Sequence, residues 1–212
     1  MIKYSNGQNF TQKSKNSRKI SVKSGSFSHG NRGMNLEDDI NLSNDYYRQK
    51  NLCLITKRPT PINVVKVDYS KGAIITSAYF EKQSTTDYNG VYKGRYIDFE
   101  AKSTLKKTSF PLANISKHQI EHLKKVIYHN GIAFFIIEFA KLNQVFLLDA
   151  RFVINFYENG ERKSIPYETF LKHGHEIKKG FAPRLNYLDI IDKIYAKSLR
   201  FLQYSLNLHN PH

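Results

Sequence analysis

The sequence of 212 residues contains one cysteine, Cys53, and no tryptophan. A single cysteine excludes an intramolecular disulfide framework and a zinc site built from cysteines. Long hydrophobic runs are also absent, because the longest, residues 132–139, is interrupted by Glu138, whereas a membrane span needs about 20 apolar residues. The N-terminal lysines accompany no apolar segment of the kind that secretory signals contain. We therefore expect a cytoplasmic protein with no membrane partner.

Acidic residues are also scarce, with 18 Asp and Glu against 33 Lys and Arg, which gives a net charge of +15. Such a charge favours a polyanionic partner, and nucleic acid is the usual one; an anionic membrane surface is the alternative. Residues 1–30 contain six Lys or Arg residues and no Asp or Glu. This composition predicts a disordered basic arm that contacts phosphates, or else a solvated tail without a role.

The first half of the remaining chain alternates between helical and strand patterns. Asn35, followed by three acidic residues, predicts the start of a helix that ends near Asn51. The apolar run 52–56 predicts a strand. Residues 62–83 contain two strand-like segments around a Ser-Lys-Gly turn, so they predict a hairpin or an extended arm. Residues 91–102 predict a further strand pair, and 106–112 a polar loop.

The second half begins with a strong helix signal. Ser116 and Gln119 form a capping box, and Gly131 predicts the end of that helix. Two core strands follow at 132–139 and 145–149. Further helices are predicted at about 151–157, at about 166–172 and from about Tyr187 onward. This order of elements predicts an α/β fold with a mixed central sheet flanked by helices.

One predicted strand carries a concentration of charge. In residues 96–104, YIDFEAKST, the side chains of Asp98, Glu100 and Lys102 share one face, whereas the opposite face is apolar. Asp87 precedes the strand and a tight turn could bring it beside Glu100. Two neighbouring carboxylates repel each other unless a cation lies between them, and a divalent metal with oxygen ligands is the usual solution. A solvated strand face is the competing interpretation, because a D…ExK pattern also arises by chance.

Several longer motifs resemble one known family. Asp-x12-Glu-x-Lys is similar to the signature of the PD-(D/E)xK nucleases, with Thr86-Asp87 in place of Pro-Asp. Motifs that resemble the RecU family of Holliday junction resolvases occur in order through the chain: Arg32–Asp39 (RGMNLEDD), Lys57–Pro61 (KRPTP), Ser84–Tyr92 (STTDYNGVY), Tyr96–Lys102 (YIDFEAK), His118–Ile120 (HQI) and Lys172–His175 (KHGH). The resemblance covers about residues 30–195.

The resemblance implies a restriction-endonuclease-like nuclease core that uses one or two Mg²⁺ ions per active site. Asp87, Glu100 and Lys102 would be catalytic, with Lys102 stabilising the transition state. Thr85 and Gln119 would complete the metal site with Asp87 and Glu100. These roles imply an endonuclease that resolves four-way DNA junctions by symmetric paired nicks in recombination and repair.

Five residues have further or alternative interpretations. Glu37 would support the metal ligands, and Asp98 would either do the same or face solvent. For Gln119, we expect that one amide cannot fully serve both as a helix cap and as a site residue. His173 and His175 have the appearance of metal ligands, but a structural role is favoured.

The resemblance also implies how the substrate is held. Residues 62–83 would be a stalk inserted in a nuclease domain of residues 31–195, and residues 196–212 a C-terminal helical extension. The protein would be a homodimer on four-way junction DNA, with the recombinase RecA as a further partner. Predicted DNA-binding residues are basic or aromatic: Arg32, Lys57, Arg58, Lys66, Lys71 and Tyr79. Tyr79 and Phe80 could instead pack in the dimer core.

Two alternative functions stay open at this point. The first is a junction-binding protein that does not cleave DNA but modulates RecA. The second is a restriction-like enzyme that cuts duplex DNA by sequence, although the stalk argues against it.

Overall fold

The computed structural model describes residues 35–70, 72–80, 85–160 and 162–195. The predicted basic arm, Arg32, Lys71 and the C-terminal extension lie outside the described residues. In chain order the elements are α1 (Leu36–Gln49), β1 (Leu54–Lys57), β2 (Ile62–Asp68), β3 (Ile74–Phe80), β4 (Tyr88–Tyr92), β5 (Arg95–Thr104), β6 (Ser109–Pro111), η1 (Leu112–Asn114), α2 (Lys117–Tyr128), β7 (Ile132–Phe139), η2 (Ala140–Leu142), β8 (Gln144–Asp149), α3 (Ala150–Glu158), β9 (Ser164–Pro166), α4 (Tyr167–His173) and β10 (His175–Glu176). Residues 188–195 are also helical.

A six-stranded sheet with the strand order β1-β4-β5-β7-β8-β10 is the centre of the fold. Strands β5 and β7 are parallel, and the other neighbouring pairs are antiparallel. A parallel pair requires a crossover connection, and α2 lies in the segment between β5 and β7. The prediction of an α/β fold with a mixed central sheet flanked by helices is therefore confirmed.

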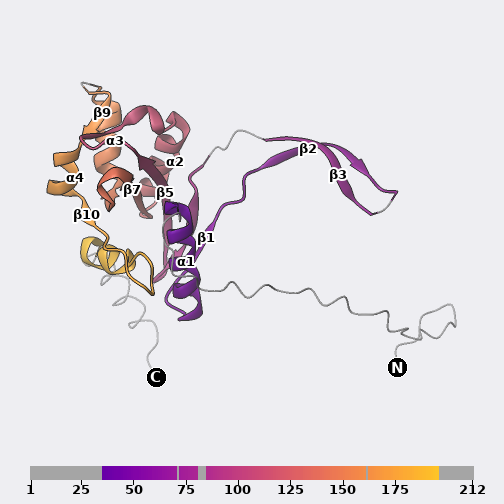
Figure 1. The fold of residues 1–212 in the computed structure, drawn as a ribbon, viewed down its shortest axis with the longest axis horizontal. Helices are drawn as coiled ribbons and strands as arrows, with labels where there is room; N and C mark the ends of the chain where they lie inside the picture. The colour runs from indigo at the N-terminus through magenta and orange to yellow at the C-terminus, as the bar shows by residue number, and fades with distance from the viewer. Residues whose placement is uncertain (1–34, 71, 81–84, 161, 196–212) are drawn as a thin grey trace. The chain divides into compact units, whose positions relative to one another are not determined.

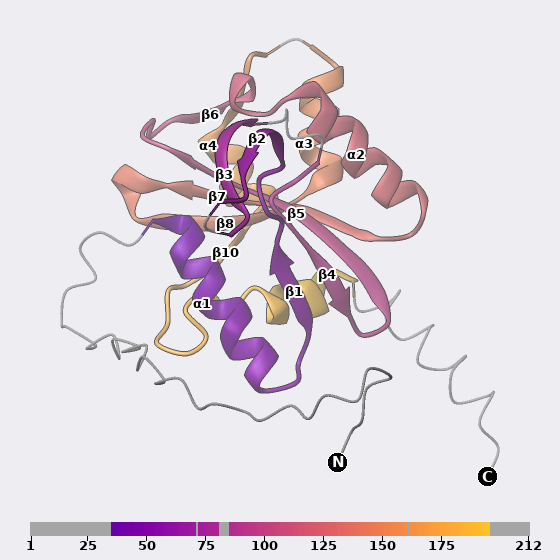
Figure 2. The ribbon, with the colours of Figure 1, turned by 90° about the vertical axis from the view of Figure 1, so that its right-hand side faces the viewer.

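Helices cover both faces of this sheet (Figures 1 and 2). One core cluster joins α1 and residues 185–195 to one face, and a second joins α2, α3 and α4 to the other. Alternation along β7 divides its side chains between the clusters, since Phe134 and Ile136 enter the first and Phe135 and Ile137 the second. The strand is buried on both sides, which explains its nearly continuous apolar sequence.

The same alternation on β5 determines where the charged residues lie. Ile97, Phe99 and Ala101 belong to the cluster on the α1 side. Asp98 and Glu100 therefore face the opposite side of the sheet, where α2 packs, and both are fully buried. The polar face of the strand is thus not solvated, and the two carboxylates lie between the sheet and a helix.

A glycine allows the edge strand β1 to approach β4 closely. Gly90 pairs with Ile55, and a Cβ atom at Gly90 would lie 2.0 Å from the carbonyl oxygen of Leu54. Any other residue at this position would push the two strands apart. This pairing matters for the site because β1 leads directly into Arg58, whose backbone N–H donates to the carbonyl of Asp87 at 2.7 Å.

The segment predicted as a hairpin or arm forms a two-stranded antiparallel sheet, β2 with β3. Its register shifts between Val64 and Val67. Large apolar side chains on it are exposed, with Phe80 at 79%. In the described part of the chain neither strand pairs with the six-stranded sheet.

The prediction of a polar loop at 106–112 is wrong in part, because β6 lies in this segment and pairs with β9. Phe110 is the partner of Ile165 in this ladder. Strand β10, which pairs with β8, was also not predicted. Both β6 and β9 have three residues and contain proline, so they give no strand pattern. The predicted helices near 151–157, 166–172 and 187 are present within one residue or so of those positions. No helix among the described residues is long and apolar enough to cross a membrane.

Candidate active site

Glu100 is at the centre of the candidate site. Its side chain is completely buried in the middle of β5. Its Oε1 atom accepts a hydrogen bond from Gln119 Nε2 at 2.6 Å and lies 2.6 Å from Lys102 Nζ. Its Oε2 atom accepts from the backbone N–H of Asp87 at 3.1 Å. The three elements β4, β5 and α2 thus meet at one carboxylate.

Strand pairing brings Asp87 to this position. Tyr88 is paired with Phe99 in the antiparallel β4–β5 ladder, so the residue before Tyr88 lies opposite Glu100. The Asp87 carboxylate is directed toward β5, where it lies 3.4 Å from the backbone nitrogen of Ala101. The predicted neighbourhood of Asp87, Glu100 and Lys102 is therefore present in the structure.

The ionisation of Glu100 is perturbed by this environment. Burial, together with the nearby charge of Asp87, raises the pKa of Glu100 from 4.5 to about 7, although Lys102 acts in the opposite direction. Desolvation and a like charge both disfavour the ionised carboxyl. The charge of Lys102 thus does not offset burial and the charge of Asp87, and a further cation beside Glu100 would favour its ionised form.

Gln119 caps α2 and also contacts Glu100. Its Oε1 accepts from the N–H of Ser116 at 3.0 Å, which caps α2. Its Nε2 donates to Glu100. The two ends of the amide point in opposite directions, so the cap and the contact with Glu100 coexist. A role of Gln119 in the metal site stays a prediction. The amide oxygen is used by the cap, so in this orientation Gln119 holds Glu100 through its nitrogen.

Asp98, two residues before Glu100, has a different environment. It is fully buried, so the interpretation as a solvated residue is wrong. Its carboxylate accepts hydrogen bonds from Arg58 at 2.7 Å, Tyr96 at 2.7 Å and His122 at 2.8 Å, and from the hydroxyl of Thr86. Burial acts to raise the pKa of Asp98, but hydrogen bonds from His122, Arg58 and Thr86 outweigh it and lower the pKa.

The Asp98 network holds the segment that carries Asp87. The Arg58 guanidinium donates to both the carbonyl oxygen and the hydroxyl of Thr86, at 3.1 and 2.7 Å. Since Asp98 binds Arg58 and Thr86 together, residues 86 and 87 are fixed relative to β5. Asp98 thus supports the position of the Asp87 carboxylate without being next to it.

Sequence analysis did not identify Thr86 and His122 as members of this network. His122 follows Gln119 by three residues, so both lie on the same side of α2, and that spacing was the available signal. Thr86 is fully buried, whereas the predicted site residue Thr85 is only partly buried and lines a groove beside α2.

Glu37 and the described members of the predicted DNA-binding set have different environments. Glu37 forms an ion pair with Lys57. Arg58 is directed into the Asp98 network, so any contact with DNA would be in addition to these bonds. Lys66 and Tyr79 are exposed on the β2–β3 hairpin. The roles of these residues in DNA binding remain predictions.

The donors fit a hard divalent cation better than a transition metal. Among the described residues no group of three or more His, Cys, Asp or Glu side chains is arranged to hold a metal. Mg²⁺ does not need such a cage, because it is commonly bound by one or two carboxylates and keeps several waters. His173 stacks on Phe152, with ring centroids 4.8 Å apart, in agreement with the structural role favoured for it.

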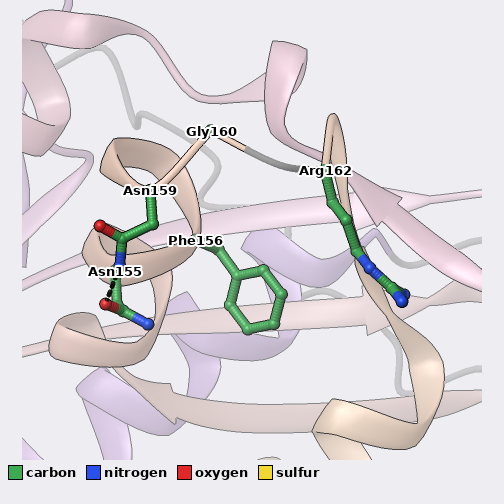
Figure 3. Close-up of a pocket in the computed structure, with 5 residues that line it drawn as sticks. All are labelled: Asn155, Phe156, Asn159, Gly160 and Arg162. Carbon is green, nitrogen blue, oxygen red and sulfur yellow. Dashed lines mark hydrogen bonds between the residues drawn. The ribbon is translucent and has the colours of Figure 1, made fainter.

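A second hollow lies away from these residues, at the end of α3 (Figure 3). It has a volume of about 180 Å³ and is lined by Asn155, Phe156, Asn159, Gly160 and Arg162. None of these residues belongs to β4, β5 or α2. Among the described residues that line the hollow there is no carboxylate.

Comparison with known proteins agrees with this geometry. A family model described as RecU, Recombination protein U, matches residues 31–193. The chain belongs to the RecU family. The family assignment that the motifs implied is thus confirmed, and Asp87, Glu100, Lys102 and Gln119 all lie inside the matched segment.

Curated RecU proteins resemble the chain over most of its length. A protein from Geobacillus sp. (strain WCH70) is 48% identical over 200 residues, covering 92% of this chain and 98% of its own. One from Geobacillus kaustophilus (strain HTA426) is 52% identical over 172 residues, covering 79% and 86%. Both are named Holliday junction resolvase RecU.

A solved structure, the Holliday junction resolvase Hjc of Archaeoglobus fulgidus, is 11% identical and covers 65% of this chain and 94% of its own, with a TM-score of 0.38. A score this low does not establish a shared fold. The sheet order and the helix layers of this RecU family member define its fold.

Proposed function

We propose that this chain is an endonuclease that resolves four-way DNA junctions, with Mg²⁺ held by Asp87 and Glu100. Family membership supports the substrate class. The observation that carries the chemistry is the meeting of Asp87, Glu100 and Lys102 at one buried position, where Glu100 has a pKa raised to about 7. Bound Mg²⁺ would neutralise charge on the phosphodiester and activate a water molecule.

The protein side chains have separate roles in this reaction. Asp87 and Glu100 supply the negative charge that attracts the metal, and Gln119 fixes the orientation of Glu100. The Lys102 ammonium lies 2.6 Å from Glu100 and is partly exposed, so it can also reach a phosphate oxygen and stabilise the charge that develops there. Hydrolysis breaks one P–O ester bond, with the water hydroxyl added to phosphorus and a proton to the leaving oxygen.

Resolution of a junction requires two cuts, and we propose that a homodimer makes them. A two-fold axis would create two equivalent sites for two strands of like polarity. The exposed apolar side chains of the hairpin, Phe80 among them, suit burial by a second copy or by unpaired bases at the branch.

The test uses a labelled mobile four-way junction and a linear duplex, each with Mg²⁺ or with EDTA. We expect symmetric nicks on the junction only, and only with Mg²⁺. Glu100→Ala should abolish cleavage but retain junction binding. Glu158→Ala is the matched control, because it removes an exposed carboxylate outside the site, and it should cleave normally.

Tight junction binding without cleavage in any divalent metal would refute this proposal. It would favour a non-cleaving junction-binding protein, and an assay of RecA filament formation would then be the next measurement. Loss of binding by Glu100→Ala would instead mean that this residue maintains the fold.

A further inference from the structure

A groove lies along α2, immediately beside the catalytic residues. Its volume is about 680 Å³, and its lining comes from residue 85 and from α2 with its cap: Thr85, Ser116, Lys117, His118, Glu121, His122 and Lys125. Thr85 is two residues from Asp87, and His122 contacts Asp98. The groove is therefore continuous with the segment that carries the site.

Two cations in this groove have no acidic partner. Lys117 and Lys125 are exposed, and neither forms an ion pair within the described part of the chain. By contrast, Lys124 lies 2.5 Å from Glu158. Glu121 is the one acidic residue of the lining, and its charge acts on Lys124. Two lysines and one glutamate leave a net positive charge on the side of α2 that borders the catalytic residues.

The spacing of the two lysines suits a nucleic-acid backbone. Eight residues of α-helix separate them, which corresponds to about 12 Å along the helix axis. One strand of duplex DNA carries about three to four phosphates over that length. Ser116 and His118 add polar side chains at the end of the groove nearest Gln119.

We propose that this groove binds the backbone of the DNA strand that flanks the scissile phosphate, with Lys117 and Lys125 contacting its phosphates. The inference rests on the proposed nuclease function and adds the direction in which the strand leaves the site, along α2. An acidic peptide would also meet two lysines, but the groove borders the catalytic carboxylates, where a substrate strand has to pass.

The test compares Lys117→Ala, Lys125→Ala and their double variant with Lys124→Ala. Lys124 is the matched control because it is on the same helix and loses the same charge, but it pairs with Glu158 and lines a different hollow, toward α3. Alanine is a good helix former, so the variants should fold, and thermal melts check this. The dissociation constant of the four-way junction is measured in EDTA at several salt concentrations.

Each groove variant should reduce the slope of log affinity against log salt by about 1. The double variant should reduce it by about 2. Lys124→Ala should leave the slope unchanged.

Two results would overturn the inference. One is a slope of log affinity against log salt that does not change in the double variant, in a protein whose wild type cleaves junctions. This result would refute the groove but leave the nuclease function intact. The other is an equal loss of affinity in Lys124→Ala and Lys125→Ala, which would indicate diffuse attraction by the whole surface. A reduced slope in a protein that cuts nothing would support the groove and refute the nuclease function.

Discussion

Replacement of Glu100 by glutamine should change the way in which stability depends on pH. Glu100 has its pKa raised from 4.5 to about 7 by burial and by Asp87. A raised carboxyl pKa stabilises the folded state fully below pH 4.5, and this stabilisation is lost as the pH rises through 7. Glutamine cannot ionise, so the variant does not suffer this loss.

The magnitude follows from the two pKa values. A rise from 4.5 to about 7 corresponds to roughly 3 kcal/mol between the fully protonated and fully ionised limits. The part of this stabilisation that is lost between about pH 5 and pH 8 is roughly 2 kcal/mol. For a domain of this size that is a relative shift in Tm of about 4–8 °C.

The assay is thermal unfolding of metal-free wild type and Glu100→Gln in EDTA from pH 5 to pH 8. The quantity compared is the change in their Tm difference with pH, because glutamine also replaces an acceptor of the Asp87 N–H with an amide, and that cost is the same at every pH. Glu158→Gln, at an exposed ion pair, should track the wild type. A Tm difference that does not vary with pH would refute the reasoning. Mg²⁺ should raise the Tm of the wild type at pH 8 and not that of Glu100→Gln.

Two further predictions concern the neighbours of Glu100. Asp98→Asn should lower the free energy of unfolding by about 3 kcal/mol, since it leaves the Arg58 charge poorly compensated. It should also raise the Mg²⁺ concentration needed for half-maximal cleavage, because residues 86 and 87 are less firmly held. A drop in the cleavage rate with an unchanged Mg²⁺ requirement would contradict a positioning role for Asp98. Lys102→Met should slow cleavage by about 10²–10³-fold, whereas junction binding in EDTA should be retained. A cleavage rate within tenfold of wild type would mean that Lys102 does not stabilise the transition state.

Local patterns in the sequence predicted most of the elements that build the site. The alternation in residues 96–104 separated the apolar and charged faces of β5 correctly, and the capping box placed the start of α2. Period-two alternation shows which residues share a face, but it cannot show what covers that face. The burial of Asp98 under α2 depends on His122, 24 residues later in the chain, and on Arg58, 40 residues earlier.

Other features were missed because their signals are long-range or too short. The β6–β9 ladder joins residues more than 50 positions apart through two three-residue strands. The bond between Arg58 and Asp98 was not predicted, because a free arginine and one bound to a buried carboxylate look the same in sequence. The contact between Gln119 and Glu100 adds to the helix cap, because an amide has a separate donor and acceptor, and the fold uses both.

The contrast between Asp98 and Glu100 supports the position that we propose for the metal. Both carboxylates are fully buried on the same face of β5, two residues apart. Asp98 accepts bonds from Arg58 and His122 as well as from two hydroxyls, and its pKa is lowered. Glu100 has one cation, Lys102, but faces Asp87, and its pKa is raised. Differing environments of this kind assign different roles to neighbouring carboxylates: Asp98 already has its compensating charge and holds the chain in place, whereas Asp87 and Glu100 are the carboxylates that we propose for the metal.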